Sequence, residues 1–94
     1  MLGGSVVGDV EELSRAFEEL AELSEIKGEV RFKVNAYNRA AELIRSQGDE
    51  ILEKSDVKEL RKYPGIGEGI AKKILQFKET GTITKLEELK EEIP

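Results

Sequence analysis

The sequence of 94 residues has no cysteine, no histidine and no tryptophan. The chain therefore has no thiol nucleophile, no imidazole base, no disulfide and no Cys/His zinc site. Covalent or acid–base chemistry would depend on lysine, carboxylate, tyrosine or hydroxyl groups. A domain this short buries only roughly 60–65% of its unfolded surface. We expect one compact domain with its site on the surface, not in a deep cavity.

Long uncharged runs are also missing. The longest is Met1–Gly8, whereas a membrane-spanning helix needs about 20 apolar residues. The amino terminus has no basic segment followed by an apolar core, so it does not resemble a secretory signal. We expect a cytoplasmic protein without membrane contact, in which residues 1–8 form a flexible amino-terminal segment and residues 9–94 the domain.

The net charge of -5 is unfavourable for nucleic-acid binding, because domains that bind nucleic acid tend to be basic. The charges are unevenly distributed, however, and residues 31–47 and 61–78 are two basic segments in an acidic chain. If the fold brings the two segments together, they form one positive face that can bind phosphates. Otherwise both are ordinary solvated helix faces.

Apolar residues that recur at three- and four-residue spacing predict helices. We expect one helix over residues 10–26, capped by Asp9 and ended by Gly28, because Asp accepts an early backbone amide and Gly commonly ends helices. A second helix is expected over residues 34–47, with Gly48 as its end. The alanines in this second stripe allow another helix to approach closely.

Shorter helices are predicted in the second half of the chain. We expect a helical turn over residues 49–54 and a short helix capped by Ser55, which ends by Tyr63 because proline follows. A longer helix carries Ile70, Ile74 and Phe77 and is closed by Gly81. A capping box of Thr84 and Glu87 opens the last helix, which runs to about Glu92. The predicted fold is an all-α compact bundle of roughly four to six short helices.

Three glycines at positions 65, 67 and 69 are compatible with a phosphate-binding loop. A dinucleotide fingerprint would need glycine at position 70, where Ile70 stands, and the G-x-x-x-x-G-K-S/T run of a Walker loop is missing. The pattern instead predicts a helix, a tight turn with Ile66 tucked inward between two glycines, and a second helix. Such a turn either presents backbone amides to a phosphate or is only a tight connection.

Residues 60–74 (LRKYPGIGEGIAKKI) resemble a helix-hairpin-helix DNA-binding motif. Together with residues 32–41 (FKVNAYNRAA) and 79–87 (ETGTITKLE), they resemble the amino-terminal domain of family X DNA polymerases, the group of DNA polymerase beta, over about residues 9–92. This resemblance implies binding to the 5′-phosphate side of a DNA gap. In several members of the family the domain also removes a 5′-deoxyribose phosphate through a lysine Schiff base.

The resemblance also assigns roles to residues of this sequence. It implies that Lys73 is the Schiff-base lysine and that Tyr37 positions the sugar, which makes both candidate catalytic residues. The implied DNA-binding residues are Phe32, Lys33, Tyr37, Gly65, Ile66, Gly67, Gly69, Lys72 and Lys85.

Two residues depart from the family pattern. Gly69 stands where the eukaryotic enzyme has a phosphate-binding lysine, and Phe32 stands where it has a base-stacking histidine. A phenylalanine ring can still stack on a base, but a glycine cannot hold a phosphate by charge. The family's hairpin also holds Na⁺ or K⁺ through backbone carbonyls, here those of Arg61, Tyr63 and Ile66, and no other cofactor is required.

Helical spacing alone places Lys73 about 60° from the Ile70, Ile74 and Phe77 stripe, whereas Lys72 points nearly opposite. A lysine at the edge of the core is partly desolvated, which lowers its pKa and favours the neutral amine that a Schiff base requires. The alternative is that the Lys73 stem covers apolar surface while its amine stays in water.

These observations predict the DNA-binding domain of a family X polymerase, which grips gapped or 5′-phosphorylated DNA without reading sequence during gap-filling repair. The expected protein is a monomer, normally fused to a polymerase catalytic region. One alternative is a 5′-deoxyribose-phosphate lyase in its own right. Another is a protein-interaction module that uses the acidic first helix.

Overall fold

The computed structural model describes residues 9–93. Within them the chain forms five helices and no strand: α1 (Val10–Lys27), α2 (Arg31–Glu53), α3 (Val57–Leu60), α4 (Glu68–Thr80) and α5 (Thr84–Glu92). The all-α fold class is therefore confirmed. The predicted flexible segment 1–8 lies outside the described residues. Across residues 9–93, no helix is both long and apolar enough to cross a membrane.

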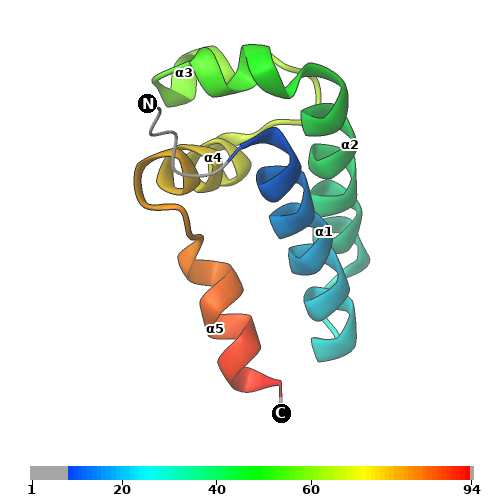
Figure 1. The fold of residues 1–94 in the computed structure, drawn as a ribbon. Helices are drawn as coiled ribbons and strands as arrows, with labels where there is room; N and C mark the ends of the chain where they lie inside the picture. The colour runs from blue at the N-terminus through cyan, green and yellow to red at the C-terminus, as the bar shows by residue number, and fades with distance from the viewer. Residues whose placement is uncertain (1–8, 94) are drawn as a thin grey trace.

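Helices α1 and α2 lie side by side and run in opposite directions, and they form the largest packed interface (Figure 1). The chain then turns across one end of this pair, where α3 packs against α4, while α4 also contacts α2. Helix α5 returns along α1 (Figure 1). The turn that follows α3 and the first part of α4 thereby lie beside α2.

The apolar stripes predicted from spacing form the core. Phe17, Leu20 and Ile44 are fully buried between α1 and α2, and the rings of Phe17 and Tyr37 lie 6.2 Å apart between centroids. Ala40 and Ala41 are both 1% exposed, as close helix packing requires. The residues of the core also include Ile70, Ile74 and Phe77 of α4 and Leu86 and Leu89 of α5.

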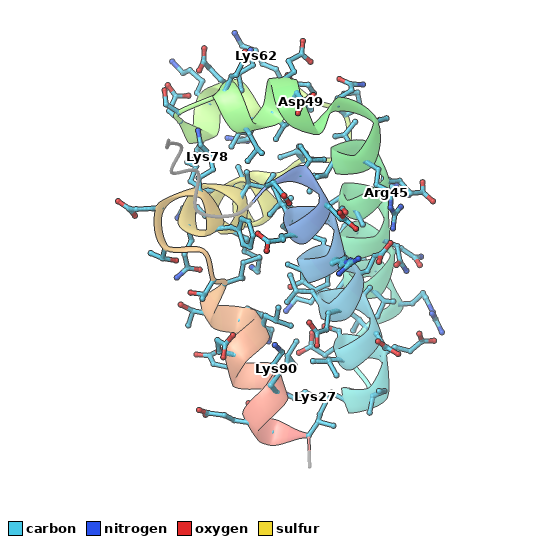
Figure 2. The ribbon with its side chains drawn as sticks, in the orientation of Figure 1. Lys27, Arg45, Asp49, Lys62, Lys78 and Lys90 are labelled. Atoms are coloured by element: carbon cyan, nitrogen blue, oxygen red, sulfur yellow. The ribbon has the colours of Figure 1, made fainter. Side chains whose placement is uncertain are left out.

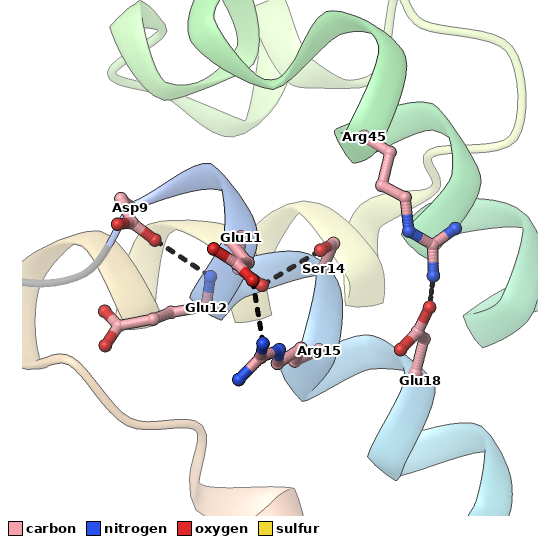
Figure 3. A network of polar contacts seen from close by, with 7 residues as sticks. All are labelled: Asp9, Glu11, Glu12, Ser14, Arg15, Glu18 and Arg45. Atoms are coloured by element: carbon pink, nitrogen blue, oxygen red, sulfur yellow. Dashed lines mark hydrogen bonds and ion pairs between the residues drawn. The ribbon is translucent and has the colours of Figure 1, made fainter.

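Both ends of α1 follow the sequence prediction. The Asp9 carboxylate accepts a hydrogen bond of 2.9 Å from the Glu12 amide, and Gly28 ends the helix with a left-handed φ of 92°. Figure 3 shows this amino-terminal end together with the ion pair that joins Glu18 of α1 to Arg45 of α2. The pair is exposed, so it contributes little to the packing of the two helices.

The predicted end of the second helix near Gly48 corresponds to a break in the helix, because Gln47 has non-helical φ and ψ angles of -132° and 24°. Helix α2 continues through Gly48 to Glu53 with a kink at Gln47, and residues 49–53 are its last part. Gly48 is needed for close approach: a Cβ there would lie 2.5 Å from Cγ1 of Val10. The glycine therefore allows the start of α1 to contact the backbone of α2.

We expect Gly48→Ala to lower the free energy of unfolding by about 1–3 kcal/mol, because the β-branched Val10 side chain cannot move aside freely. Urea denaturation of the variant against the parent chain measures this change. Shortening Val10 to alanine in the same chain should recover most of the loss, which a double-mutant cycle quantifies. Stabilisation by Gly48→Ala, as helix propensity alone predicts, would contradict the packing argument.

Two predicted caps also differ from the structure. Asp56, not Ser55, caps α3, because its carboxylate accepts a 2.8 Å hydrogen bond from the Glu59 amide. Thr84 is the first residue of α5 and makes no capping box, since its amide donates to Gln76 Oε1 at 2.9 Å. In contrast, Gly81 ends α4 with a φ of 81°, as predicted.

Candidate functional site

The turn between α3 and α4 has the predicted hairpin form. Gly65 adopts a φ of 92°, and the Ile66 amide donates to the Tyr63 carbonyl at 3.1 Å. Ile66 is only 4% exposed, so it is the inward-pointing plug of the turn. A Cβ at Gly65 would lie 3.1 Å from Cδ of Arg39, which means that α2 packs directly against the turn.

A groove of about 680 Å³ lies between this turn, the first part of α2 and the first part of α4. It brings together most of the predicted site residues, namely Phe32, Lys33, Tyr37, Arg61, Tyr63, Gly65, Ile66, Gly67, Gly69 and Lys73. Lys72 and Lys85 line an adjacent hollow, which shares Gly69 and Lys73 with the groove. The two basic segments therefore meet on one side of the molecule.

Three polar residues of the groove were not among the predicted site residues. Asn35, Arg39 and Lys62 also line it. Arg39 and Lys62 belong to the two basic segments, so their charge was a signal in the sequence. Figure 2 places Lys62 at the α3 end of the molecule, away from α5. Positive charge therefore extends along the groove beyond Lys33 at the beginning of α2.

Lys73 lies at the edge of the core, as the helical spacing predicts. Its Nζ atom is 5.9 Å from the centroid of the Tyr37 ring, a cation–π contact. Burial lowers the pKa of Lys73, and the nearby charges of Lys33 and Lys85 lower this pKa further. The neighbouring Lys72 is exposed and pairs with Glu68 at 3.2 Å. The two adjacent lysines are therefore in different environments.

Tyr37 belongs to both the core and the groove. The residue is 4% exposed, and its ring packs against Phe17 on one side. Burial raises the pKa of its hydroxyl, so the phenol stays neutral at neutral pH. Phe32, five residues earlier in α2, is 80% exposed at the rim of the same groove.

Lys33 of α2 and Lys85 of α5 meet at one carboxylate. Glu29, in the link between α1 and α2, accepts a hydrogen bond of 3.3 Å from Lys85 and lies 3.9 Å from the Lys33 amine. Sequence reasoning missed Glu29. Lys85 is 56 positions further along the chain, so no local pattern signals this contact.

A helix, a glycine turn and a second helix beside a basic groove define a helix-hairpin-helix domain. Residues 9–83 match the family of helix-hairpin-helix domains, and the chain belongs to this family. It is similar to the DNA polymerase/3′-5′ exonuclease PolX of Bacillus subtilis (strain 168), with 32% identity over 83 residues. The match covers 88% of this chain and 14% of that relative. The resemblance to family X DNA polymerases is thereby confirmed.

The described side chains do not suggest a metal centre of the carboxylate, histidine or cysteine type. Over residues 9–93, no group of three or more Asp, Glu, His or Cys side chains is arranged to hold a metal ion.

Proposed function

We propose that this chain is the DNA-binding domain of a family X polymerase and that it holds the 5′-phosphate side of a gap in DNA. The observation that carries the proposal is the meeting of Lys33, Lys73 and Lys85, from three different helices, beside the hairpin groove. Converging lysines form a positive site in an otherwise acidic protein. A terminal phosphate carries more negative charge than an internal one and is the ligand that such a site favours.

The arrangement favours contacts to the DNA backbone over contacts to base edges. Lysine amines and the open glycine turn can contact phosphates, which are the same for every sequence. The 80% exposed ring of Phe32 can stack on an unpaired base at the gap, because every base has a π-face. Binding should therefore depend on salt and on the phosphate but hardly on sequence.

Fluorescence anisotropy with a gapped duplex, with and without the 5′-phosphate in the gap, tests this proposal. We expect the phosphate to raise affinity by about 3–10-fold, and log K to fall linearly with log salt concentration. Gapped duplexes of scrambled sequence should bind equally well. No binding at micromolar protein would contradict the proposal and would favour a protein-interaction module that uses the acidic α1.

Gap-filling repair is the setting that we propose for this binding. The relative that matches is named as a DNA polymerase and exonuclease, and the chain spans 14% of its length. Nucleotidyl transfer would accordingly belong to a larger protein in which this domain holds the DNA.

A second candidate function is 5′-deoxyribose-phosphate lyase activity at Lys73. It is favoured by the half-buried position of the amine over the Tyr37 ring and by the lowered pKa of Lys73. The neutral amine would add to the C1′ aldehyde of the opened sugar and form an imine with loss of water. A proton then leaves C2′, the C3′–O bond breaks, and the 5′-phosphate end of the DNA is released; water hydrolyses the imine and restores the amine.

We also propose that the hairpin holds Na⁺ or K⁺ through the backbone carbonyls of Arg61, Tyr63 and Ile66. The fit is favourable: in the described part of the chain, the Arg61 and Ile66 carbonyls accept no backbone hydrogen bond, and the Tyr63 carbonyl accepts one. Their free lone pairs suit a hard monovalent cation, which would add positive charge beside a bound phosphate.

Replacing KCl with tetramethylammonium chloride at constant ionic strength tests the cation proposal, because the bulky cation cannot enter the turn. We expect the affinity for gapped DNA to fall by about 3–10-fold, since each lost phosphate interaction weakens binding by a measurable amount. Return of affinity on adding KCl, with the total salt unchanged, is the control. Equal affinity in both salts would contradict a cation at the hairpin.

A further inference from the structure

Glu29 has a fixed position in the link between α1 and α2. Gly28 takes the left-handed conformation, and the Glu29 amide donates to the Ser24 carbonyl at 2.9 Å, closing the end of α1. Helix α2 begins two residues later, at Arg31. The backbone on both sides of Glu29 is thus held by helix ends, so its side chain starts from a defined point.

The Glu29 carboxylate contacts lysines from three helices. Its Oε2 atom lies 3.3 Å from Lys85 Nζ of α5 and 4.0 Å from Lys27 Nζ of α1, and its Oε1 atom lies 3.9 Å from Lys33 Nζ of α2. The side chain is only 15% exposed. Among residues 9–93 no group donates a hydrogen bond to Oε1, although that oxygen is buried. The carboxylate therefore lies inside the lysine cluster.

The charge of Glu29 opposes that of the lysines around it. Burial alone would raise the pKa of this carboxyl, but Lys85, Lys33 and Lys27 lower it overall, so the group is ionised at neutral pH. Lys33 and Lys85 are the amines that the proposed function assigns to a DNA phosphate. In the free protein these amines already have an anion between them.

We propose that Glu29 is a built-in competitor for phosphate: it holds Lys33 and Lys85 together in the free protein, and a bound DNA phosphate replaces it as their partner. This inference rests on the proposed function, because it assigns the same two lysines to phosphate. Without the carboxylate, the positive amines of Lys33, Lys73 and Lys85 would repel one another and move apart into solvent. With the carboxylate present, an incoming phosphate is repelled by a negative charge a few ångströms away.

The competitor role predicts opposite changes in stability and in DNA affinity. Glu29→Gln keeps the size of the side chain and an oxygen that can accept from Lys85, but it removes the charge. The free protein should then be less stable, whereas its complex with DNA should be tighter. A residue with a purely structural role would instead weaken binding, or leave it unchanged, when its replacement destabilises the fold.

The test compares Glu29→Gln with the parent chain in thermal unfolding and in anisotropy with 5′-phosphorylated gapped DNA. We expect a melting temperature lower by about 2–5 °C, an affinity higher by about 3–10-fold, and a slope of log K against log salt that is steeper by about one. Glu29→Asp keeps the charge and should bind no more tightly than the parent chain.

Glu92→Gln is the matched control. It removes the same charge near the same end of the molecule, since Glu92 pairs with Lys27 but contacts neither Lys33 nor Lys85. Figure 2 shows Lys27 beside the carboxyl-terminal end of α5, where Glu92 lies. Glu92→Gln therefore measures the general effect of a less acidic protein on DNA binding.

The two proposals fail in different ways. If Glu29→Gln binds DNA no more tightly than Glu92→Gln while the parent chain binds normally, the competitor role alone is overturned. If the parent chain and all the variants fail to bind phosphorylated gapped DNA, the proposed function is overturned, and the competitor role with it.

Discussion

Replacing both Lys33 and Lys85 with alanine is expected to lower the affinity for 5′-phosphorylated gapped DNA by about 100-fold. Hydrogen bonds to charged groups contribute about 1.5–3 kcal/mol each, and every 1.4 kcal/mol is about a factor of ten in affinity. The two amines come from α2 and α5 and share one anion in the free protein. A phosphate between them would lose both contacts in the double variant.

The effect of this double variant has to be separated from a general loss of positive charge. The double variant Lys54→Ala/Lys90→Ala removes the same amount of positive charge and serves as the control. Lys54 follows the end of α2, and Lys90 on α5 pairs with Glu19 of α1. We expect this control pair to weaken binding only a few-fold and equally with and without the 5′-phosphate. Equal losses in the two double variants would contradict a phosphate site at Lys33 and Lys85.

Lys73→Ala is expected to abolish the covalent adduct that borohydride traps on DNA carrying a 5′-deoxyribose phosphate. The adduct requires an amine that can form an imine, and alanine has none. DNA affinity of the variant should fall only a few-fold, because Lys33 and Lys85 remain. The readout is the protein–DNA band on a denaturing gel, measured beside anisotropy on the same preparation.

Lys90→Ala is the control for this variant, because Lys90 on α5 pairs with Glu19 of α1, outside the groove, and its loss should leave the adduct intact. The pH dependence gives a second check. Burial, Lys33 and Lys85 lower the pKa of Lys73, and only the neutral amine reacts, so adduct formation should rise with pH and reach half its maximum below pH 10.5. An adduct that survives in Lys73→Ala, or a wild-type chain that binds DNA without any adduct, would contradict lyase activity at this residue.

The helices were largely predictable because helix formation depends on local spacing and local caps. Asp9, Gly28 and Gly81 act as the sequence indicated, and the apolar stripes of α1, α2 and α4 are buried. The errors have tertiary causes. Gly48 lies at a kink inside α2, without a left-handed φ, where Val10 packs against its backbone, and Thr84 forms no capping box because Gln76 Oε1 accepts its amide.

The positions of the candidate site residues were predictable to a similar degree. The glycine turn and the partly buried Lys73 follow from motif and helical spacing, and the groove brings them together with Phe32, which the resemblance implied. Their roles in binding and chemistry stay predictions. Arg39, which packs over Gly65, was visible only as one charge in a basic segment.

The sequence by itself determined that this protein is a small helical domain with a helix-hairpin-helix turn, because periodicity, caps and turn glycines act within a few residues of one another. Only the tertiary structure decided that the two basic segments lie on one side of the molecule and that Glu29 lies among their lysines. Electrostatic interactions act through space over a few ångströms, and the packing of α5 against α1 sets the distance between Glu29 and Lys85.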